Sequence, residues 1–172
     1  MGIELRERWG VQPLWARWVL AVYLIGFIEG TGSHIADLVR GGIHAYASFP
    51  QVSLQVFFVS LVILDPLAAV LVGLVRREGI WLASAVMLLD VSANLWGNRH
   101  WLMDDPAQLL WLLPITVFGL FVVAFAAPLH RAVAGAASRS PAALLPAQQA
   151  AEGTRRGSDQ VTEADPRGWG IT

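Results

Sequence analysis

The chain has 172 residues, of which 55% are hydrophobic and only 15% are charged, and its mean hydropathy is +0.53. This composition excludes an ordinary soluble domain and predicts an integral membrane protein. The formal net charge of -1, with Arg residues scattered along the chain, provides no basic field for nucleic acid, which we exclude as a partner. The absence of Cys excludes structural disulfides, a thiol nucleophile and thiolate metal sites.

Four stretches of the sequence are apolar enough and long enough to cross a bilayer as helices. A helix needs about 20 apolar residues to cross a hydrocarbon core of ~30 Å. The stretches run from Leu14 to Ala36, from Gln51 to Val75, from Ile80 to about Gly97, and from Ala107 to Pro128. Charged or helix-breaking residues bound each of them. We therefore predict an all-α integral membrane protein, with a four-transmembrane-helix bundle in residues 14–130.

The Arg residues are distributed unequally between the two sides of this bundle, and basic residues near helix ends are retained on the cytoplasmic side. One side holds Arg6, Arg8, Arg17, Arg76, Arg77, Arg131 and Arg139, whereas the other holds Arg40 and Arg99. This asymmetry predicts that both the N and C termini are cytoplasmic, with residues 1–13 as a cytoplasmic N-terminal segment. All 12 basic residues are Arg, and Ala and Gly are abundant, which is typical of a GC-rich bacterial genome. We therefore expect a multi-pass protein of a bacterial plasma membrane, with the lipid bilayer as its first partner.

Aromatic residues and the C-terminal composition fit the same topology. Trp15, Trp18 and Trp81 fall at the predicted inner boundary and Tyr46, Trp101 and Trp111 near the outer one. Amphipathic rings prefer the headgroup level, so we predict that these residues form two aromatic belts. Residues 131–172 are rich in Ala, Pro, Gly and Ser and are predicted to be a disordered cytoplasmic tail.

Carboxylic acids lie inside the predicted spans without an Arg beside them. A charged side chain at the bilayer centre costs at least ~2.5 kcal/mol, so it has to be paired, protonated or in contact with water. Because successive helices run in opposite directions, the polar residues of all four spans lie at overlapping depths in the central and outer half. We predict that they line a polar cavity open toward the outer face. The predicted ligand-binding residues are Glu29, Gln55, Asp65, Asp90, Asn94 and Thr116.

Helical spacing connects this predicted cavity with its rim. Asp90, Asn94 and Asn98 are spaced by four residues and project from one helix face. Pro66, directly after Asp65, frees a carbonyl one turn back and bends its helix. The predicted rim consists of His34, Asp37, His44 and Asn98. In the alternative interpretation the amides serve only as hydrogen bonds between helices, and Gly26 and Gly30 have the spacing of a close helix contact.

The side chains of the predicted cavity favour binding over catalysis. Carboxylates and amides with aromatic neighbours suit a cationic amphiphile, so we expect a hydrophobic or cationic small ligand. His34, Asp37 and His44 have zinc-binding side chains, but no dense ligand motif is present, so we expect neither a metal nor a cofactor. A G-x-S-x-G elbow and phosphate-binding Gly-rich signatures are absent, which argues against a hydrolase or a nucleotide-binding enzyme. The residues alone assign no catalytic role.

Four motifs resemble the EXPERA families, which include the emopamil-binding sterol isomerases and the sigma-2 receptor. They are HIADL (34–38), SLVILDP (60–66), LLDVSANLW (88–96) and LLWLLP (109–114). The resemblance implies a sterol-like or amine ligand, with Asp37, Asp65 and Asp90 as cavity acids, or an isomerase that stabilises a carbocation. The helix-two glutamate of that family has no counterpart at Ser60, so the isomerase activity does not carry over.

The segment GLVRREGIWLASAVML (73–88) is similar to the DoxX-type family of bacterial four-helix membrane proteins. In that family an Arg-bearing turn separates the second and third helices. This resemblance implies an accessory subunit of a larger membrane complex, whose polar stripes face a partner membrane subunit or a second copy of the chain. Two hypotheses of different classes, a ligand binder and a subunit, therefore follow from the sequence.

Overall fold

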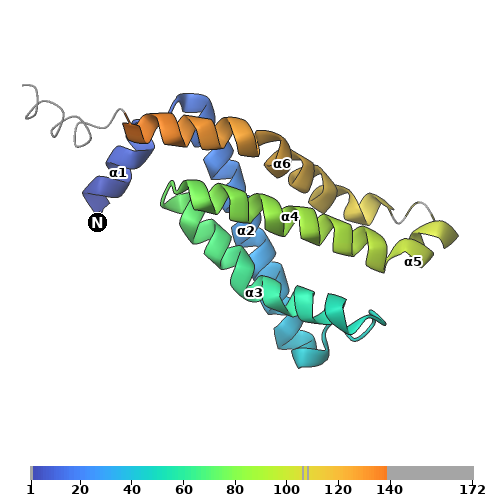
Figure 1. Cartoon of the computed structure of the whole chain (residues 1–172). Coiled ribbons are helices and arrows are strands. Elements are labelled where there is room, and N and C mark those ends of the chain that lie inside the picture. The colour runs from blue at the N-terminus through green and yellow to red at the C-terminus, as the bar shows by residue number, and fades with distance from the viewer. Residues whose placement is uncertain (1, 106, 108, 139–172) are drawn as a thin grey trace, which may run out of the picture. The chain divides into compact units, whose positions relative to one another are not determined.

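The computed structural model describes residues 2–105, 107 and 109–138, and every regular element in these ranges is helical. In chain order the elements are α1 (Gly2–Gly10), α2 (Leu14–Gly41), η1 (Gly42–His44), α3 (Val52–Gly73), α4 (Arg77–Gly97), α5 (Arg99–Asp104) and α6 (Leu109–Ser138), as Figure 1 shows. The chain divides into a unit of residues 1–134 and a unit of residues 135–172. The contacts described below belong to the first unit.

Four of the described helices, α2, α3, α4 and α6, are long and apolar enough to cross a membrane. The predicted all-α architecture with four apolar helices of membrane length is therefore confirmed. Large apolar side chains remain on the outside of these helices: Ile25 is 69% exposed, Ile63 70% and Leu120 66%. Such exposure is unfavourable in water and is expected of surfaces that face lipid.

Several boundaries differ from those expected from the sequence. α2 continues to Gly41 and ends where Gly42 takes a positive φ of 58°, a conformation that glycine adopts without steric cost. The short helices α1 and α5 were not predicted. α6 passes Pro128 and includes residues 131–138, which were predicted as part of the tail. The proline removes only one backbone hydrogen bond, and the Ala-rich residues after it favour a helix. The rest of the predicted tail, residues 139–172, lies outside the described residues.

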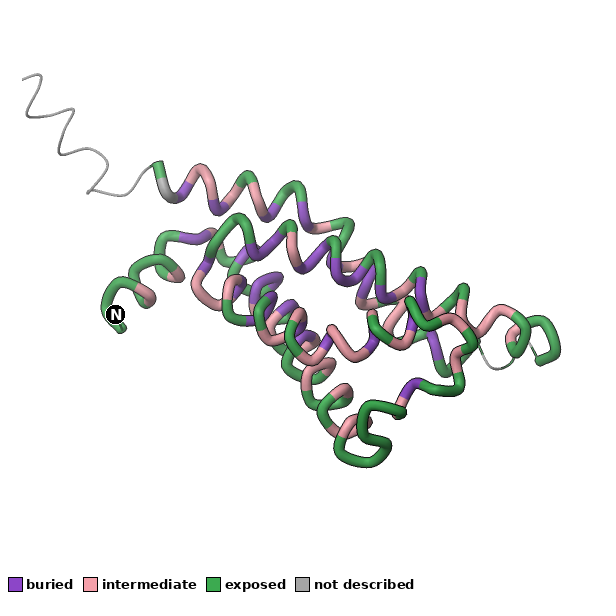
Figure 2. Tube along the Cα trace, turned by 60° about the horizontal axis from the view of Figure 1, so that its bottom comes forward, coloured by how far each residue is buried: buried purple, intermediate pink, exposed green. Residues whose placement is uncertain are grey.

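The long helices pack around one apolar core. α2 packs along α3, and α3 along α4. α6 joins them through aromatic contacts: Phe27 meets Phe118 edge-on, with 5.8 Å between ring centroids, and the Tyr23 hydroxyl donates to the Val122 carbonyl. Figure 2 shows that buried residues recur along these helices. Buried core members are Leu20, Tyr23, Phe27, Leu61, Val72, Ile80, Ala83, Val122, Ala126 and Leu129.

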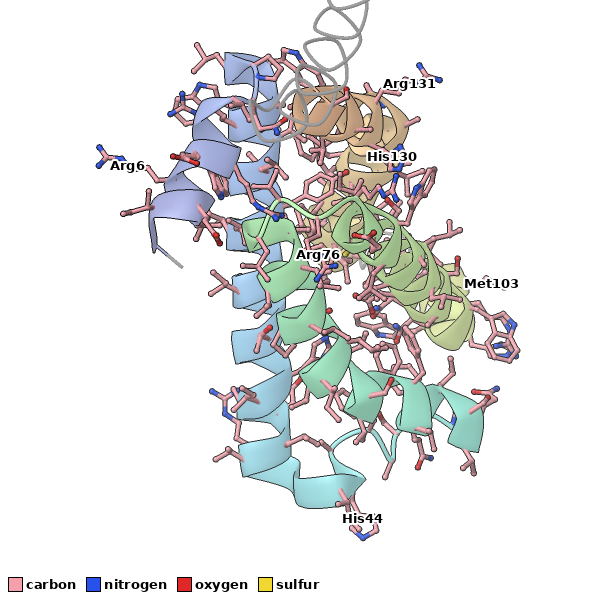
Figure 3. The ribbon with its side chains drawn as sticks, turned by 60° about the vertical axis from the view of Figure 1, so that its left-hand side comes forward. Arg6, His44, Arg76, Met103, His130 and Arg131 are labelled. Carbon is pink, nitrogen blue, oxygen red and sulfur yellow. The ribbon has the colours of Figure 1, made fainter. Side chains whose placement is uncertain are left out.

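The turns between helices gather at opposite ends of this unit. α1, the turn between α3 and α4, and the stretch of α6 that leads up to residue 134 lie toward one end, and η1 lies at the other (Figure 1). In Figure 3 the labelled Arg6 and Arg131 lie toward the first end and His44 at the second. Consecutive long helices therefore run in opposite directions, and the two ends differ in their Arg content.

Candidate functional site

Polar side chains of α2, α3, α4 and the loop after η1 lie near one another in the helical unit. We call this group the polar cluster; it consists of His34, Asp37, Tyr46, Asp65, Asp90 and Asn94. Asp65 is only 4% exposed and Asp90 only 5%, although both lie within apolar helices. The negative charges of Asp90 and Glu29 both act on the Asp65 carboxyl. The two buried acids are therefore near enough for the charge of Asp90 to affect Asp65.

Tyr46 joins two side chains of α2 at the outer edge of the cluster. Its hydroxyl lies 2.8 Å from His34 Nδ1 and donates to Asp37 Oδ2 at 3.1 Å. The phenol has one proton, which it donates to Asp37. The Nδ1 atom of His34 therefore has to donate to the phenol oxygen. His34 Nε2 then faces Asp65 Oδ2 at 3.8 Å. This contact is favourable when a proton lies on either of the two atoms, which makes it a place where the protein can hold a proton.

Three acids contribute to the electrostatic surroundings of Tyr46. Burial raises the pKa of the Tyr46 phenol most, followed by the charge of Asp37 and the hydrogen bond to Asp37. The charges of Asp90 and Asp65 raise this pKa further. The charges of carboxylates on three different helices therefore act on one hydroxyl. The sequence pattern predicted an aromatic-belt position for Tyr46. Its ring is instead buried and stacks on Phe58, with 5.3 Å between the centroids, whereas Trp101 and Trp111 are exposed.

The raised pKa of Tyr46 predicts a loss of stability at alkaline pH. The folded state holds the phenol proton more tightly than the unfolded state, whose tyrosine pKa is about 10. The contribution of Tyr46 to stability is therefore complete below about pH 10 and is lost as pH rises through its folded pKa. Thermal melts followed by circular dichroism should show the wild-type midpoint falling above about pH 10. Tyr46→Phe should show a smaller fall, and an equal fall in both proteins would contradict this account.

Asparagines on α4 hold the Asp90 side chain and extend toward the helix end. Asn94 Nδ2 donates to Asp90 Oδ1 and to the Asp90 carbonyl, each at 3.0 Å. Asn98 Nδ2 donates to the Asn94 carbonyl at 2.9 Å. The predicted stripe is thus one face of α4, and its amides bond within the helix. Asn94 positions one oxygen of Asp90, whereas Asn98 serves the end of α4.

Gly30 allows α3 to approach α2 at the cluster. A Cβ atom at this position would lie 2.8 Å from Asp65 Oδ2, closer than carbon and oxygen tolerate. Its partner in the predicted small-residue spacing, Gly26, makes room instead for the Phe118 ring of α6. The two glycines therefore serve contacts with different helices, and Gly30 brings a carboxyl group against the backbone of α2.

Other predicted site residues lie apart from these contacts. Gln55 donates to the Phe49 carbonyl at 2.7 Å and so supports the segment before α3. Thr116 has a buried hydroxyl oxygen without a hydrogen-bond partner, one turn before Gly119, whose surroundings include Val91 of α4. Glu29 and His44 are exposed, and Glu29 acts on Asp65 only through its charge. Within the ranges that the structure describes, no three His, Asp or Glu side chains are placed to hold a metal ion.

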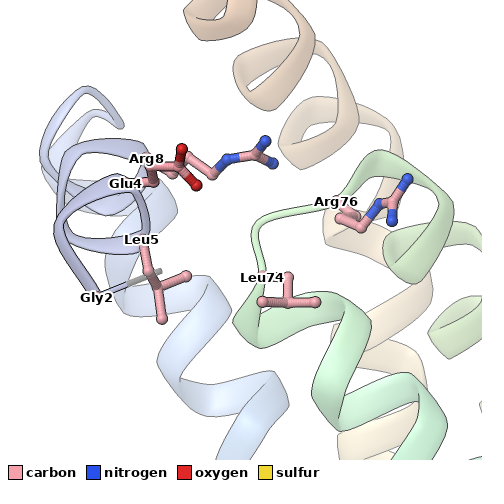
Figure 4. A pocket seen from close by; sticks show the side chains of 6 residues that line it. All are labelled: Gly2, Glu4, Leu5, Arg8, Leu74 and Arg76. Carbon is pink, nitrogen blue, oxygen red and sulfur yellow. The ribbon is translucent and has the colours of Figure 1, made fainter.

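A pocket of about 370 Å³ lies away from the polar cluster, between α1 and the turn that joins α3 to α4 (Figure 4). Its lining residues are Gly2, Glu4, Leu5, Arg8, Leu74 and Arg76. None of the predicted site residues belongs to this lining. The pocket and the polar cluster are therefore separate features of the helical unit.

No family model, curated protein or solved structure matches this chain. The resemblances to the EXPERA and DoxX-type families therefore stay predictions. The polar cluster therefore provides the main indication of function. It contains two buried carboxyl groups, Asp65 and Asp90, and the His34 imidazole, which contacts Asp65. The Tyr46 phenol links this imidazole to the carboxyl group of Asp37.

Proposed function

We propose that the chain is a four-span protein of a bacterial plasma membrane, with cytoplasmic termini, that binds a small hydrophobic amine. The cationic group of the ligand lies between Asp65 and Asp90, and its apolar body lies among the surrounding helices. The observation that carries this proposal is the burial of two carboxyl groups that no Arg of the described residues neutralises. His34 is the basic side chain that contacts Asp65.

The cost of burying two carboxylates favours a cation between them. Leaving a charged carboxylate in an apolar span costs ~2.5–3.5 kcal/mol, and the charge of Asp90 adds repulsion at Asp65. A bound ammonium group offsets both terms and donates hydrogen bonds to the carboxylate oxygens. A neutral ligand offsets neither. The site therefore discriminates by charge, and the apolar helices supply affinity for the rest of the molecule.

The Arg distribution supports an outward-facing site. Arg6 and Arg131 lie toward one end of the helical unit in Figure 3, and basic residues near spans are retained in the cytoplasm. His34, Asp37 and Tyr46 lie near η1, toward the opposite end. With this orientation the ligand reaches Asp65 from the outer leaflet or the outer face, past the hydroxyl of Tyr46.

One observation favours a second candidate function, an accessory subunit. Glu29 is exposed within α2, where it would face lipid in a monomer. A partner membrane subunit, or a second copy of the chain, would satisfy this carboxyl group with a polar side chain. In that case Glu29 lies in an interface between helices of two chains, and the polar cluster stabilises the fold around it.

A pair of probes that differ in charge tests the proposed function. The purified full-length chain in phosphatidylcholine nanodiscs is titrated with N,N-dimethyldodecylamine and, as a neutral match, 1-dodecanol. We expect saturable binding of the amine, seen as a rise in melting temperature, and no saturable binding of the alcohol. Equal behaviour of both probes would refute recognition by charge. Native mass spectrometry of the same sample separates the two candidates, because a subunit would be recovered with another polypeptide.

A further inference from the structure

The pocket between α1 and the α3–α4 turn combines two basic side chains with two apolar ones. Arg8 belongs to α1 and Arg76 to the turn, so segments far apart in sequence each contribute a basic residue to the lining. Leu5 and Leu74 provide apolar wall, and Glu4 adds a carboxylate to the lining (Figure 4). A pocket with this lining is suited to an anionic group attached to a hydrocarbon chain.

A specific contact holds α1 in the position that forms the pocket. Trp9 Nε1 donates to the Gly73 carbonyl at 2.8 Å, and the Trp9 ring packs against the core. Carbonyls at the last turn of a helix lack partners within that helix, so Trp9 satisfies one of those at the end of α3. Because this bond fixes α1 next to the α3–α4 turn, Arg8 and Arg76 are held on the same pocket.

The charge of the pocket is incompletely neutralised by the protein. Among the residues that the structure describes, Arg8 forms no ion pair within 4.0 Å. Arg76 lies 3.6 Å from Glu78, and that carboxylate is shared with Arg77 at 3.4 Å. Exposed ion pairs of this kind exchange readily with other partners, since they contribute little free energy. Neither basic residue of the lining is therefore held by a strong ion pair among the described residues, and both can reorient toward an anion.

We propose that this pocket binds the phosphate headgroup of an anionic phospholipid, with an acyl chain against Leu5 and Leu74. Guanidinium groups form paired, charge-assisted hydrogen bonds with phosphate oxygens, and basic pockets between membrane helices recognise anionic headgroups. Trp15 and Trp81 are exposed near the beginnings of α2 and α4, as expected for rings at headgroup level. Free phosphate shares the recognised group but makes no use of the apolar walls.

Lipid retention by matched Arg variants tests this site. The full-length chain is extracted from mixed phosphatidylcholine and phosphatidylglycerol bilayers, and native mass spectrometry gives the ratio of the two retained lipids. Arg8→Gln and Arg76→Gln are expected to lower the preference for phosphatidylglycerol several-fold. Arg6→Gln on the same helix and Arg77→Gln next to Arg76 remove the same charge outside the pocket lining and should retain the preference.

A variant that is expected to increase the preference for phosphatidylglycerol controls for variants that lose the preference by unfolding. Glu4→Gln removes the acid from the pocket and should increase the preference for phosphatidylglycerol, whereas Glu7→Gln, on the same helix but outside the lining, should not. An equal fall in all four Arg variants would show non-specific surface attraction and overturn the proposal. Saturable binding of inorganic phosphate, together with no lipid preference, would overturn the assignment to lipid.

Discussion

Asp90→Asn is expected to weaken binding of the amine probe roughly thirtyfold while the folded protein becomes no less stable. Losing one partner of a buried charge pair costs about 2 kcal/mol or more, which corresponds to that change in affinity. In the wild type Asn94 Nδ2 lies 3.0 Å from Asp90 Oδ1, and the oxygen of the new asparagine can accept the same hydrogen bond. The substitution therefore removes the buried charge and keeps the local geometry. Isothermal titration in nanodiscs and a thermal melt measure the two effects.

The expected combination of weaker binding and retained stability distinguishes a ligand site from a structural one. Asp65→Asn should weaken binding similarly, although it also removes the negative charge opposite His34 Nε2. Asp104→Asn, at an exposed position of α5, makes the same chemical change outside the cluster and should leave the affinity as in the wild type. Unchanged amine affinity in both Asp65→Asn and Asp90→Asn would exclude these acids as recognition groups.

Properties that repeat along one helix could be predicted from the sequence. Mean apolar character over about 20 residues predicts the four long helices, because the bilayer imposes length and polarity together. The spacing of Asp90, Asn94 and Asn98 predicts a polar face, and the hydrogen bonds along α4 follow that face. Such patterns depend on helix geometry alone, and so they are independent of how neighbouring helices pack.

Contacts between elements could not be predicted in this way. Tyr46 was predicted to be a belt residue because the sequence indicates how far it lies from a helix end. The sequence does not indicate in which direction its side chain points. Its hydroxyl meets His34 only because η1 folds the chain back on α2. The approach of Asp65 to Gly30 depends on the packing of α3 on α2, and the Arg8–Arg76 pocket on one hydrogen bond of Trp9. Each of these features is set by tertiary packing, which a single sequence does not specify.

Gly79→Ala is expected to destabilise the fold strongly for a single added methyl group, because the new atom meets backbone. A Cβ at Gly79 would lie 2.6 Å from Leu71 Cβ, 2.7 Å from the Leu71 carbonyl carbon and 2.8 Å from Val72 N. Backbone at the end of α3 cannot rotate away as a side chain can, so α4 has to shift from α3. Overpacking of this kind costs about 1–3 kcal/mol. Thermal melts in detergent should show a midpoint several degrees lower.

Gly32→Ala is the matched control for the Gly79 variant, since nothing lies within 4 Å of the added carbon. Replacing a helical glycine by alanine without a clash favours the helix by up to about 1 kcal/mol, so this variant should melt at or above the wild-type temperature. A lower melting temperature for Gly79→Ala and a higher one for Gly32→Ala would mean that contact between α3 and α4, rather than helix propensity, determines the effect at Gly79. A Gly79→Ala protein that melts like the Gly32→Ala protein would contradict the close packing of α4 on the end of α3. That packing also orders the α3–α4 turn that presents Arg76 to the pocket.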